Sequence, residues 1–304
     1  MTQRPARSRR TVLSVPASSE RFLDKSVGLD VDQVFLDLED GVAAAAKDEA
    51  RSRAVEALRA RTWLAPTVSV RVNGWATPWT HRDVIDVVAG AGGRLDTVFL
   101  PKVTSPGQVE ALDLLLTQVE RLHGLAVGRI GIEVLLEDAV ALTRADDIAA
   151  ASPRLEALHV GPGDLMASLG LPSLLVGGLS DGYPGDPLHH AYARILVAAR
   201  ARGLQAVDGP YVAVHDVAGF RASAGRAAAL GYDGKWVLHP AQIAAGTEAF
   251  TPSPEALARA EEMVAAAARG AASGVGAVLL GDEMVDEAGV SLAQATLARG
   301  RRST

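Results

Sequence analysis

Residues 129–164 read RIGIEVLLEDAVALTRADDIAAASPRLEALHVGPGD, and they contain the pattern on which the fold prediction rests. A short apolar run, Arg129–Leu136, ends in acidic residues and is followed by an Ala- and Leu-rich segment with helical spacing. A second apolar run, Ala157–Val160, then ends in a glycine-rich turn. Continuous apolar runs of this length are typical of strands that are buried on both faces of a parallel sheet. The stretch therefore predicts a strand, a helix and a second, parallel strand.

The same pattern recurs along the chain and gives eight candidate strands. They are Thr11–Val15, Gln33–Leu38, Thr67–Val72, Thr97–Leu100, Arg129–Leu136, Ala157–Val160, Leu204–Val207 and Trp236–Leu238. Eight parallel strands that alternate with helices in about 250 residues are typical of a TIM barrel. We therefore predict an α/β fold, with a closed (β/α)8 catalytic barrel over residues 1–250. A doubly wound nucleotide-binding sheet is disfavoured, because no G-x-G-x-x-G follows the first run and no G-x-x-x-x-G-K-[ST] occurs.

The chain beyond the eighth unit reads differently. TPSP at 251–254 interrupts the pattern, Glu255–Arg269 has helical spacing, and Gly270–Gly276 is rich enough in glycine to suggest a flexible connection. The remaining tail keeps ordered patterns in Ala277–Met284 and Ser291–Arg299. We predict that residues 251–304 form a C-terminal helical extension, or lid, which packs on its own barrel or on that of a neighbour.

Composition narrows the classes of protein. With 304 residues, 48% of them apolar, the chain can bury a large core. The absence of Cys excludes disulfides and thiolate metal sites and fits a reducing compartment. A net charge of −6 argues against nucleic acid as a partner. The basic first ten residues precede no long apolar stretch, and no segment approaches the roughly 20 apolar residues of a membrane helix. We expect a soluble, cytoplasmic protein.

Polar residues follow the candidate strands at their carboxyl ends, where barrels of this type carry their active sites. They are Asp37, Glu39 and Asp40, Arg71 and Asn73, Lys102, Glu137 and Asp138, Asp164, Asp208, and His239. Carboxylates outnumber bases in this set, and carboxylates that lie close together repel one another unless they are protonated or bridged by a cation. A divalent metal would remove that conflict. Without Cys or a close pair of His, oxygen ligands favour Mg²⁺ or Mn²⁺ over Zn²⁺.

Glu137 and Asp164 are the best candidate pair for such a metal, because they follow neighbouring strands. The glycines around Asp164, including Gly163, leave room for the backbone to approach a ligand. The alternative is a salt bridge from either carboxylate to Arg71 or Lys102. The residues alone leave both interpretations open.

Each of the remaining mouth residues also has two interpretations. The guanidinium of Arg71 suits a substrate carboxylate or an oxyanion, or it pairs with the acids that follow the second strand. Lys102 forms a Schiff base with a carbonyl substrate, or it stays cationic and paired. His239 is a general acid or base, or a hydrogen-bonded structural histidine. We interpret the four tryptophans as packing residues: Trp63, Trp75, Trp79 and Trp236.

Nine stretches, in order along nearly the whole chain, resemble the citrate lyase β-subunit and malyl-CoA lyase family of the HpcH/HpaI aldolase type. They are VPASSERFLDK (15–25), DQVFLDLEDGV (32–42), VRVNGWATPW (70–79), FLPKV (99–103), IEVLLEDAVAL (132–142), ASPRLEALHVGPGDLMASLG (151–170), LQAVDGPY (204–211), GYDGKWVLHPAQI (231–243) and GDEMVDEA (281–288). GPGDLMASLG and GKWVLHPAQI are more similar to the malyl-CoA lyase branch. One departure is VPASS, where the family more often has V-P-G-S-N.

The resemblance implies a barrel of the phosphoenolpyruvate/pyruvate type in which Glu137 and Asp164 hold Mg²⁺. It implies that Arg71 binds the oxygen of a thioester enolate or the acid substrate. It further implies that Asp286, in the terminal M-[VI]-D motif, is the acid/base that reaches the site of a neighbouring subunit, in a homotrimer or a hexamer.

The resemblance also implies that Arg21 and Lys25 meet the phosphates of coenzyme A. This agrees with the general preference of phosphate for basic groups and helix N-termini. Gly163 is expected on the substrate side, and Asp37, Glu39, Asp40, Lys102 and His239 are expected to support the site.

The function that follows is a Mg²⁺-dependent carbon–carbon lyase or synthase. It would interconvert malyl-CoA, citramalyl-CoA or β-methylmalyl-CoA with an acyl-CoA and a 2-oxo acid such as glyoxylate. The alternatives are a malyl-CoA thioesterase or malate synthase-like outcome, a citrate lyase β-type subunit that acts on a carrier-protein thioester within a complex, and a non-catalytic binding module.

Overall fold

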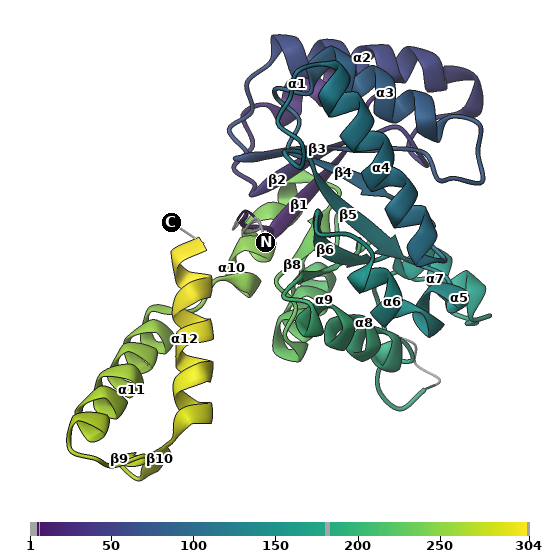
Figure 1. Ribbon diagram of the computed structural model, residues 1–304. Coiled ribbons are helices and arrows are strands. Elements are labelled where there is room, and N and C mark those ends of the chain that lie inside the picture. The colour runs from purple at the N-terminus through teal and green to yellow at the C-terminus, as the bar shows by residue number, and fades with distance from the viewer. Residues whose placement is uncertain (1–4, 6, 180–182, 303–304) are drawn as a thin grey trace. The chain divides into compact units, whose positions relative to one another are not determined.

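The computed structural model describes residues 5, 7–179 and 183–302, and they form two compact units (Figure 1). The larger unit contains Arg9–Phe250, and the smaller one contains the chain from Thr251 onward. Within the described residues, no helix combines the length and the hydropathy that a transmembrane span requires.

The larger unit is a closed barrel of parallel strands. In order around the barrel they are β1 Thr11–Pro16, β2 Gln33–Asp37, β3 Thr67–Arg71, β4 Thr97–Leu100, β5 Gly131–Leu136, β6 Leu155–Val160, β7 Gln205–Asp208 and β8 Gly234–Val237. The barrel closes where β8 pairs in parallel with β1. The predicted (β/α)8 barrel is confirmed, and each predicted strand lies within about two residues of an observed one.

Helices cover the outside of the barrel. They are α1 Glu20–Ser26, α2 Lys47–Ala60, α3 Thr80–Ala91, α4 Pro106–Leu122, α5 Ala139–Thr143, α6 Ala145–Ala150, α7 Pro162–Ser168, α8 His189–Ala201, α9 Val217–Leu230 and α10 Ile243–Phe250, with short 3₁₀ turns η1 Ala44–Ala46 and η2 Pro240–Gln242. Helix α4 shows why they pack: it buries Val109, Leu112, Leu116 and Val119, which share one face. The strands between helices and barrel interior are buried on both faces, as their apolar runs predict.

The barrel interior is layered, because every second residue of a strand points inward. An apolar layer lies in the middle and contains Val12, Phe35, Phe99, Leu135, Ala157, Val207 and Trp236. Two residues earlier on β2 and β5, Gln33 and Glu133 are buried and polar. Two residues later, Asp37 and Glu137 stand at the carboxyl ends. The period of two thus places a polar layer on each side of the apolar one.

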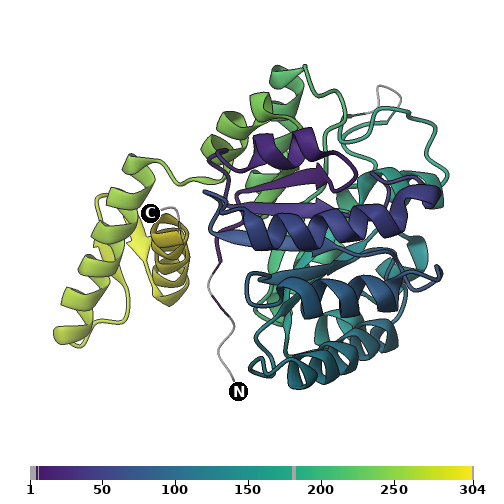
Figure 2. The ribbon, with the colours of Figure 1, turned by 90° about the horizontal axis from the view of Figure 1, so that it is seen from above.

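The smaller unit is a pair of helices joined by a hairpin. Helix α11 spans Pro254–Ala272 and packs against α12, Glu287–Arg302, as both ribbon views show (Figures 1 and 2). Between them, β9 Val278–Leu280 pairs antiparallel with β10 Glu283–Val285. The extension predicted over residues 251–304 begins where this unit begins, and its role as a lid stays a prediction. Helix α11 continues to Ala272, inside the segment predicted to be flexible, and the β9–β10 hairpin overlaps the segment 277–284, which was predicted only to be ordered.

Candidate active site

Arg71 is the best-anchored cation at the carboxyl ends of the strands. It is the last residue of β3 and lies beside Asp37, the last residue of β2. Its Nε and Nη2 donate to the two oxygens of Asp37 at 2.7 and 2.8 Å, and its Nη1 lies 2.9 Å from Glu39 Oε2. Burial alone would raise the pKa of Asp37, but the Arg71 guanidinium holds that pKa below its ordinary value. The pair is therefore fully charged, with fixed fork geometry.

Aromatic rings hold the face of the same guanidinium. Its central carbon lies 5.4 Å from the ring centroid of Trp236 and 5.7 Å from that of Phe35. Both rings belong to the apolar layer of the barrel. Carboxylates fix the edge of the Arg71 guanidinium. The two rings contact its face, and this attraction is a cation–π interaction. Trp236 packs in the core, as predicted, and its ring also contacts Arg71 at the barrel mouth.

The loop after β2 supplies two more carboxylates. Glu39 is buried, and burial raises its pKa. Lys102 Nζ lies 2.8 Å from Glu39 Oε1 and 3.3 Å from Asp40 Oδ1. Burial alone would lower the pKa of Lys102, yet these two carboxylates raise it above the ordinary value. The geometry thus favours a cationic, paired lysine over one that forms a Schiff base.

Glu137 follows β5 directly and is 4% exposed. Its Oε1 accepts a hydrogen bond of 2.6 Å from the backbone N–H of Lys102, a residue held at φ 55°. Burial, together with the negative charges of Glu39 and Asp164, raises the pKa of Glu137 to about 8. Gly161 makes the space, because a Cβ there would lie 2.3 Å from Glu137 Oε2. Glu137 is therefore a carboxyl that resists ionisation unless a cation comes close.

Asp164 lies in the first turn of α7 and is exposed. It is close enough to Glu137 for its charge to act on that carboxyl. Across the part of the chain that the structure describes, neither carboxylate forms a salt bridge, which argues against the pairing with Arg71 or Lys102. In the same part there is no group of three or more His, Cys, Asp or Glu that could hold a metal. A metal here would take few protein ligands, as Mg²⁺ usually does.

The structure also gives the positions of four other residues that were predicted for the site. His239 caps η2, since its Nδ1 accepts from the Ala241 N–H at 3.2 Å, and this fits the structural interpretation. Arg21 and Lys25 are exposed on α1. Gly163 is in the first turn of α7, with Val176 as the nearest contact for an added Cβ.

Asp286 belongs to the smaller unit. It is half-buried and precedes α12, where its Oδ1 accepts from the Gly289 N–H at 2.9 Å. This local bond caps the helix. The second carboxylate oxygen, Oδ2, takes no part in it.

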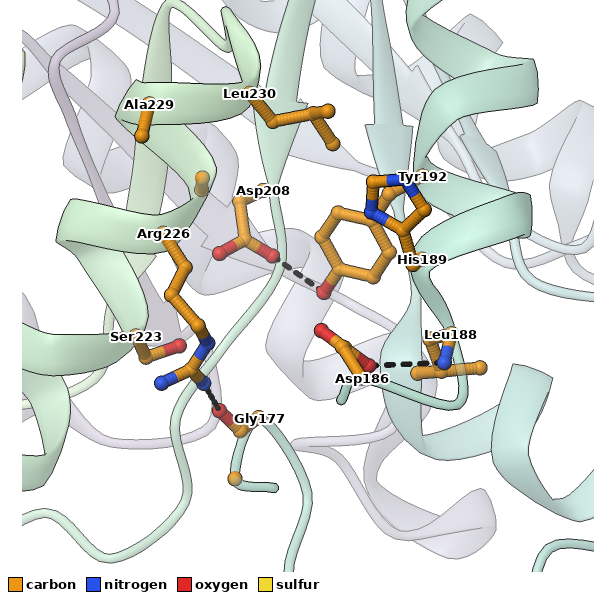
Figure 3. Close-up of a pocket in the computed structure, with 12 residues that line it drawn as sticks. Gly177, Asp186, Leu188, His189, Tyr192, Asp208, Ser223, Arg226, Ala229 and Leu230 are labelled. Atoms are coloured by element: carbon orange, nitrogen blue, oxygen red, sulfur yellow. Dashed lines mark hydrogen bonds between the residues drawn. The ribbon is translucent and has the colours of Figure 1, made fainter. Parts of the chain in front are cut away.

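Asp208, expected at the mouth, turns outward. Its neighbour Val207 packs inside the barrel, so Asp208 faces the helices, where it accepts from Lys235 Nζ and from the Tyr192 hydroxyl at 2.7 Å. It lines a cavity of about 370 Å³ between α8 and α9, with Arg226 pointing to Gly177 across it (Figure 3). Asp208 therefore does not belong to the cluster around Arg71. Its buried partner Lys235 was not predicted, because that prediction requires knowing which residues of each strand point out of the barrel.

A second buried group escaped the sequence interpretation. Glu133 and His159 lie inside the barrel and are fully buried, with His159 Nε2 2.6 Å from Glu133 Oε2. Arg9 Nε and Nη2 donate to the same carboxylate at 3.1 Å. The alternation of Glu133 with Leu135 and Glu137 along one strand is the sequence pattern that could have revealed an inward-facing acid.

The closed barrel with acids and a guanidinium at its mouth defines a (β/α)8-barrel enzyme. Residues 10–240 match the family model described as HpcH/HpaI aldolase/citrate lyase, and the chain belongs to this family. The family membership expected from the nine stretches is thus confirmed.

Similar proteins of known name cover nearly the whole chain. An L-malyl-CoA/beta-methylmalyl-CoA lyase of Cereibacter sphaeroides is 40% identical over 299 residues, which are 95% of this chain and 94% of that protein. A (3S)-malyl-CoA thioesterase of the same species is 34% identical over 292 residues, 95% of this chain and 94% of that protein. The crystal structure of CitE from Mycobacterium tuberculosis in complex with magnesium, acetoacetate and coenzyme A is 34% identical and superposes with a TM-score of 0.75, covering 97% of this chain and 99% of that one.

Proposed function

We propose that this chain is a carbon–carbon lyase that reversibly cleaves malyl-CoA or a methylated homologue into an acyl-CoA and a 2-oxo acid such as glyoxylate. The observation that carries the proposal is the anchored Arg71 beside the hard-to-ionise Glu137 at one barrel mouth. The 40% identity with a malyl-CoA/beta-methylmalyl-CoA lyase supports the substrate class.

Arg71 suits the charge that such a cleavage develops. When the carbon–carbon bond breaks, the electron pair passes to the thioester and gives an enolate whose oxygen carries negative charge. A guanidinium has five N–H donors; the contacts with Asp37 and Glu39 use three of them, and two remain for that oxygen. Asp37, Trp236 and Phe35 fix the group before the substrate arrives, so little reorganisation is needed during the reaction.

Glu137 and Asp164 fit a divalent cation. Each is free of a salt bridge within residues 5, 7–179 and 183–302, and the charge of Asp164 helps to keep Glu137 protonated in the absence of a cation. We assign Mg²⁺, with Mn²⁺ as a substitute, to these two carboxylates; when bound it would polarise the hydroxyl and carboxylate of the substrate. Gly161 and the Lys102 N–H hold Glu137 in place for this task.

The remaining assignments belong to the same proposal. Asp286 is the acid/base that protonates the enolate carbon or removes the proton from acetyl-CoA, and it serves a neighbouring subunit in a homotrimer or hexamer. Arg21 and Lys25 bind the phosphates of coenzyme A, which their exposure on α1 supports. Gly163 gives the substrate access to the backbone of α7. The absence of Cys supports a cytoplasmic location.

One assay separates the proposed activity from thioester hydrolysis. The purified protein is mixed with Mg²⁺, glyoxylate and acetyl-CoA or propionyl-CoA, and glyoxylate, total thioester and free CoA are followed together, with and without a chelator. A lyase consumes glyoxylate while total thioester stays constant and no free CoA appears, and the chelator stops it. Free CoA released in step with glyoxylate consumption would instead identify condensation followed by hydrolysis, which is a malate synthase-like outcome. No change in glyoxylate with either acyl-CoA would contradict the proposed lyase activity.

A further inference from the structure

The face of Arg71 rests on a ring that is itself fixed from below. Trp236 contacts the Arg71 guanidinium at 5.4 Å and packs on Phe35 with ring centroids 4.6 Å apart. On its far side, the indole Nε1–H donates to His159 Nδ1 at 2.9 Å. An indole nitrogen can only donate, so His159 Nδ1 must be the acceptor.

That bond fixes the tautomer of His159. With Nδ1 accepting, the ring proton of the neutral imidazole sits on Nε2, which faces Glu133 Oε2 at 2.6 Å. Burial lowers the pKa of His159, consistent with a neutral ring. The ring thus connects a buried carboxylate to the indole through one defined donor and one defined acceptor.

Glu133 anchors this chain of bonds to the barrel wall. Its carboxylate accepts from Arg9 on the N-terminal side of β1, from Gln33 Nε2 on β2 at 2.8 Å and from Thr97 Oγ1 on β4 at 2.7 Å. The acceptor is therefore held from several strands at once and cannot swing with any one of them. Both oxygens of the Glu133 carboxylate accept hydrogen bonds, and buried groups that are satisfied in this way rigidify a core.

We propose that His159 and Trp236 are positioning residues that hold the Arg71 guanidinium at the barrel mouth in one plane, through the bonds Glu133–His159–Trp236 and the ring contact. This inference rests on the proposed function, since it assigns Arg71 to the reacting oxygen. In this inference both side chains act through Arg71 and not directly on the substrate. Their effect is on the turnover step, because the guanidinium must already lie in the plane of the developing oxyanion.

Four variants test the inference. Trp236→Leu removes the ring beneath Arg71, and His159→Leu removes its support with little change in volume. His159→Gln keeps an acceptor and a donor and is the conservative variant. Phe99→Leu is the matched control for the loss of ring packing alone. Phe99 packs on His159 and Phe35, with ring centroids 4.6 and 5.0 Å apart, but in the part of the chain that the structure describes its ring has no contact with Arg71 and takes no part in the bonds from Glu133 to Trp236.

The readouts are kcat and KM for the acyl-CoA thioester, together with the thermal unfolding midpoint. Trp236→Leu and His159→Leu should lower kcat by about ten- to a hundredfold, with KM within about twofold. His159→Gln should recover most of kcat, and Phe99→Leu should lose less than about threefold although it is destabilised as much. Equal losses of kcat in Phe99→Leu, or an unchanged kcat in both leucine variants at positions 159 and 236, would overturn the inference.

A crystal structure of Trp236→Leu separates this inference from the proposed function. If the unaltered protein cleaves no CoA thioester, the proposed function fails, and the position of Arg71 in the variant still decides the inference. We expect its guanidinium to leave the plane that it has above Trp236. An Arg71 that keeps its position without the ring would rule out the positioning role.

Discussion

At the scale of single residues, metal binding at the barrel mouth depends on how difficult it is to ionise Glu137. Its pKa of about 8 means that the carboxyl is mostly protonated in the metal-free protein at neutral pH. A metal ion needs the carboxylate, so proton and Mg²⁺ compete for it. Because the pKa of Glu137 is raised, the affinity for Mg²⁺ should decrease as the pH falls below that pKa.

We expect the affinity for Mg²⁺ to fall by up to about tenfold for each pH unit below about 8, and to level off above it. Isothermal titration calorimetry between about pH 6 and about pH 9, in buffers of different ionisation enthalpy, measures both the affinity and the proton released. Glu137→Gln should bind weakly with almost no pH dependence. An affinity that is constant across the range in the unaltered protein would contradict the assignment of Glu137 as a ligand.

Arg71 offers a second test at this scale. Arg71→Lys keeps a positive charge next to Asp37 but loses the planar fork and the face that rests on Trp236. We expect kcat to fall by about a hundredfold or more, since one positioned oxyanion donor group is lost, while the protein stays folded. Arg129→Lys is the control, because Arg129 bonds backbone carbonyls such as that of Leu95, before β5 begins. Similar losses in both variants would mean that Arg71 has no special role.

At the scale of the elements, the site depends on where β5 and β6 end. Glu137 follows β5, and the turn after β6 passes so close that only glycine fits at position 161. Gly161→Ala would place a Cβ 2.3 Å from Glu137 Oε2 and 2.4 Å from Glu137 Cβ, and it must therefore displace the carboxylate.

We expect Gly161→Ala to lower the affinity for Mg²⁺ by about tenfold or more, as displaced ligands do. Gly163→Ala in the same turn is the control for metal affinity, because its Cβ would come no closer than 3.7 Å to Val176. Calorimetric titration of both variants with Mg²⁺ measures the difference. Unchanged affinity in Gly161→Ala would show that the carboxylate of Glu137 can move without cost, or that it does not bind the ion.

The elements also show how far sequence reasoning reaches. The strands were predictable because each is a continuous apolar run. The ends of those runs predicted that Arg71, Glu137 and Asp164 lie at the carboxyl ends of the strands. The phase of a short strand was not predictable: β7 has only four residues, so nothing local shows that Asp208 points outward. The bond between His159 and Trp236 joins residues 77 positions apart, and only closure of the barrel brings them together. Local patterns therefore find strand ends well and buried polar networks poorly.

At the scale of the whole molecule, the chain divides its proposed chemistry between two units. Glu137 and Arg71 belong to the barrel, whereas Asp286 belongs to the helix–hairpin–helix unit that begins at Thr251. In the part of its own unit that the structure describes, the Asp286 side chain makes one hydrogen bond, in which Oδ1 caps α12. If Asp286 completes the site of a neighbouring subunit, each active site needs residues from two chains, and the reaction becomes a property of the oligomer.

Mixed oligomers test this arrangement. Glu137→Gln and Asp286→Asn should each be almost inactive alone, since one lacks the metal ligand and the other lacks the acid/base. Co-expressed in equal amounts, they should regain about a quarter of the activity of the unaltered protein, because random assembly pairs an intact Glu137 with an intact Asp286 from the next subunit in about one site in four. If both residues act within one chain, every chain carries a defect and the mixture stays inactive. Activity per oligomer, measured after co-purification through two different affinity tags, therefore decides whether the site is shared.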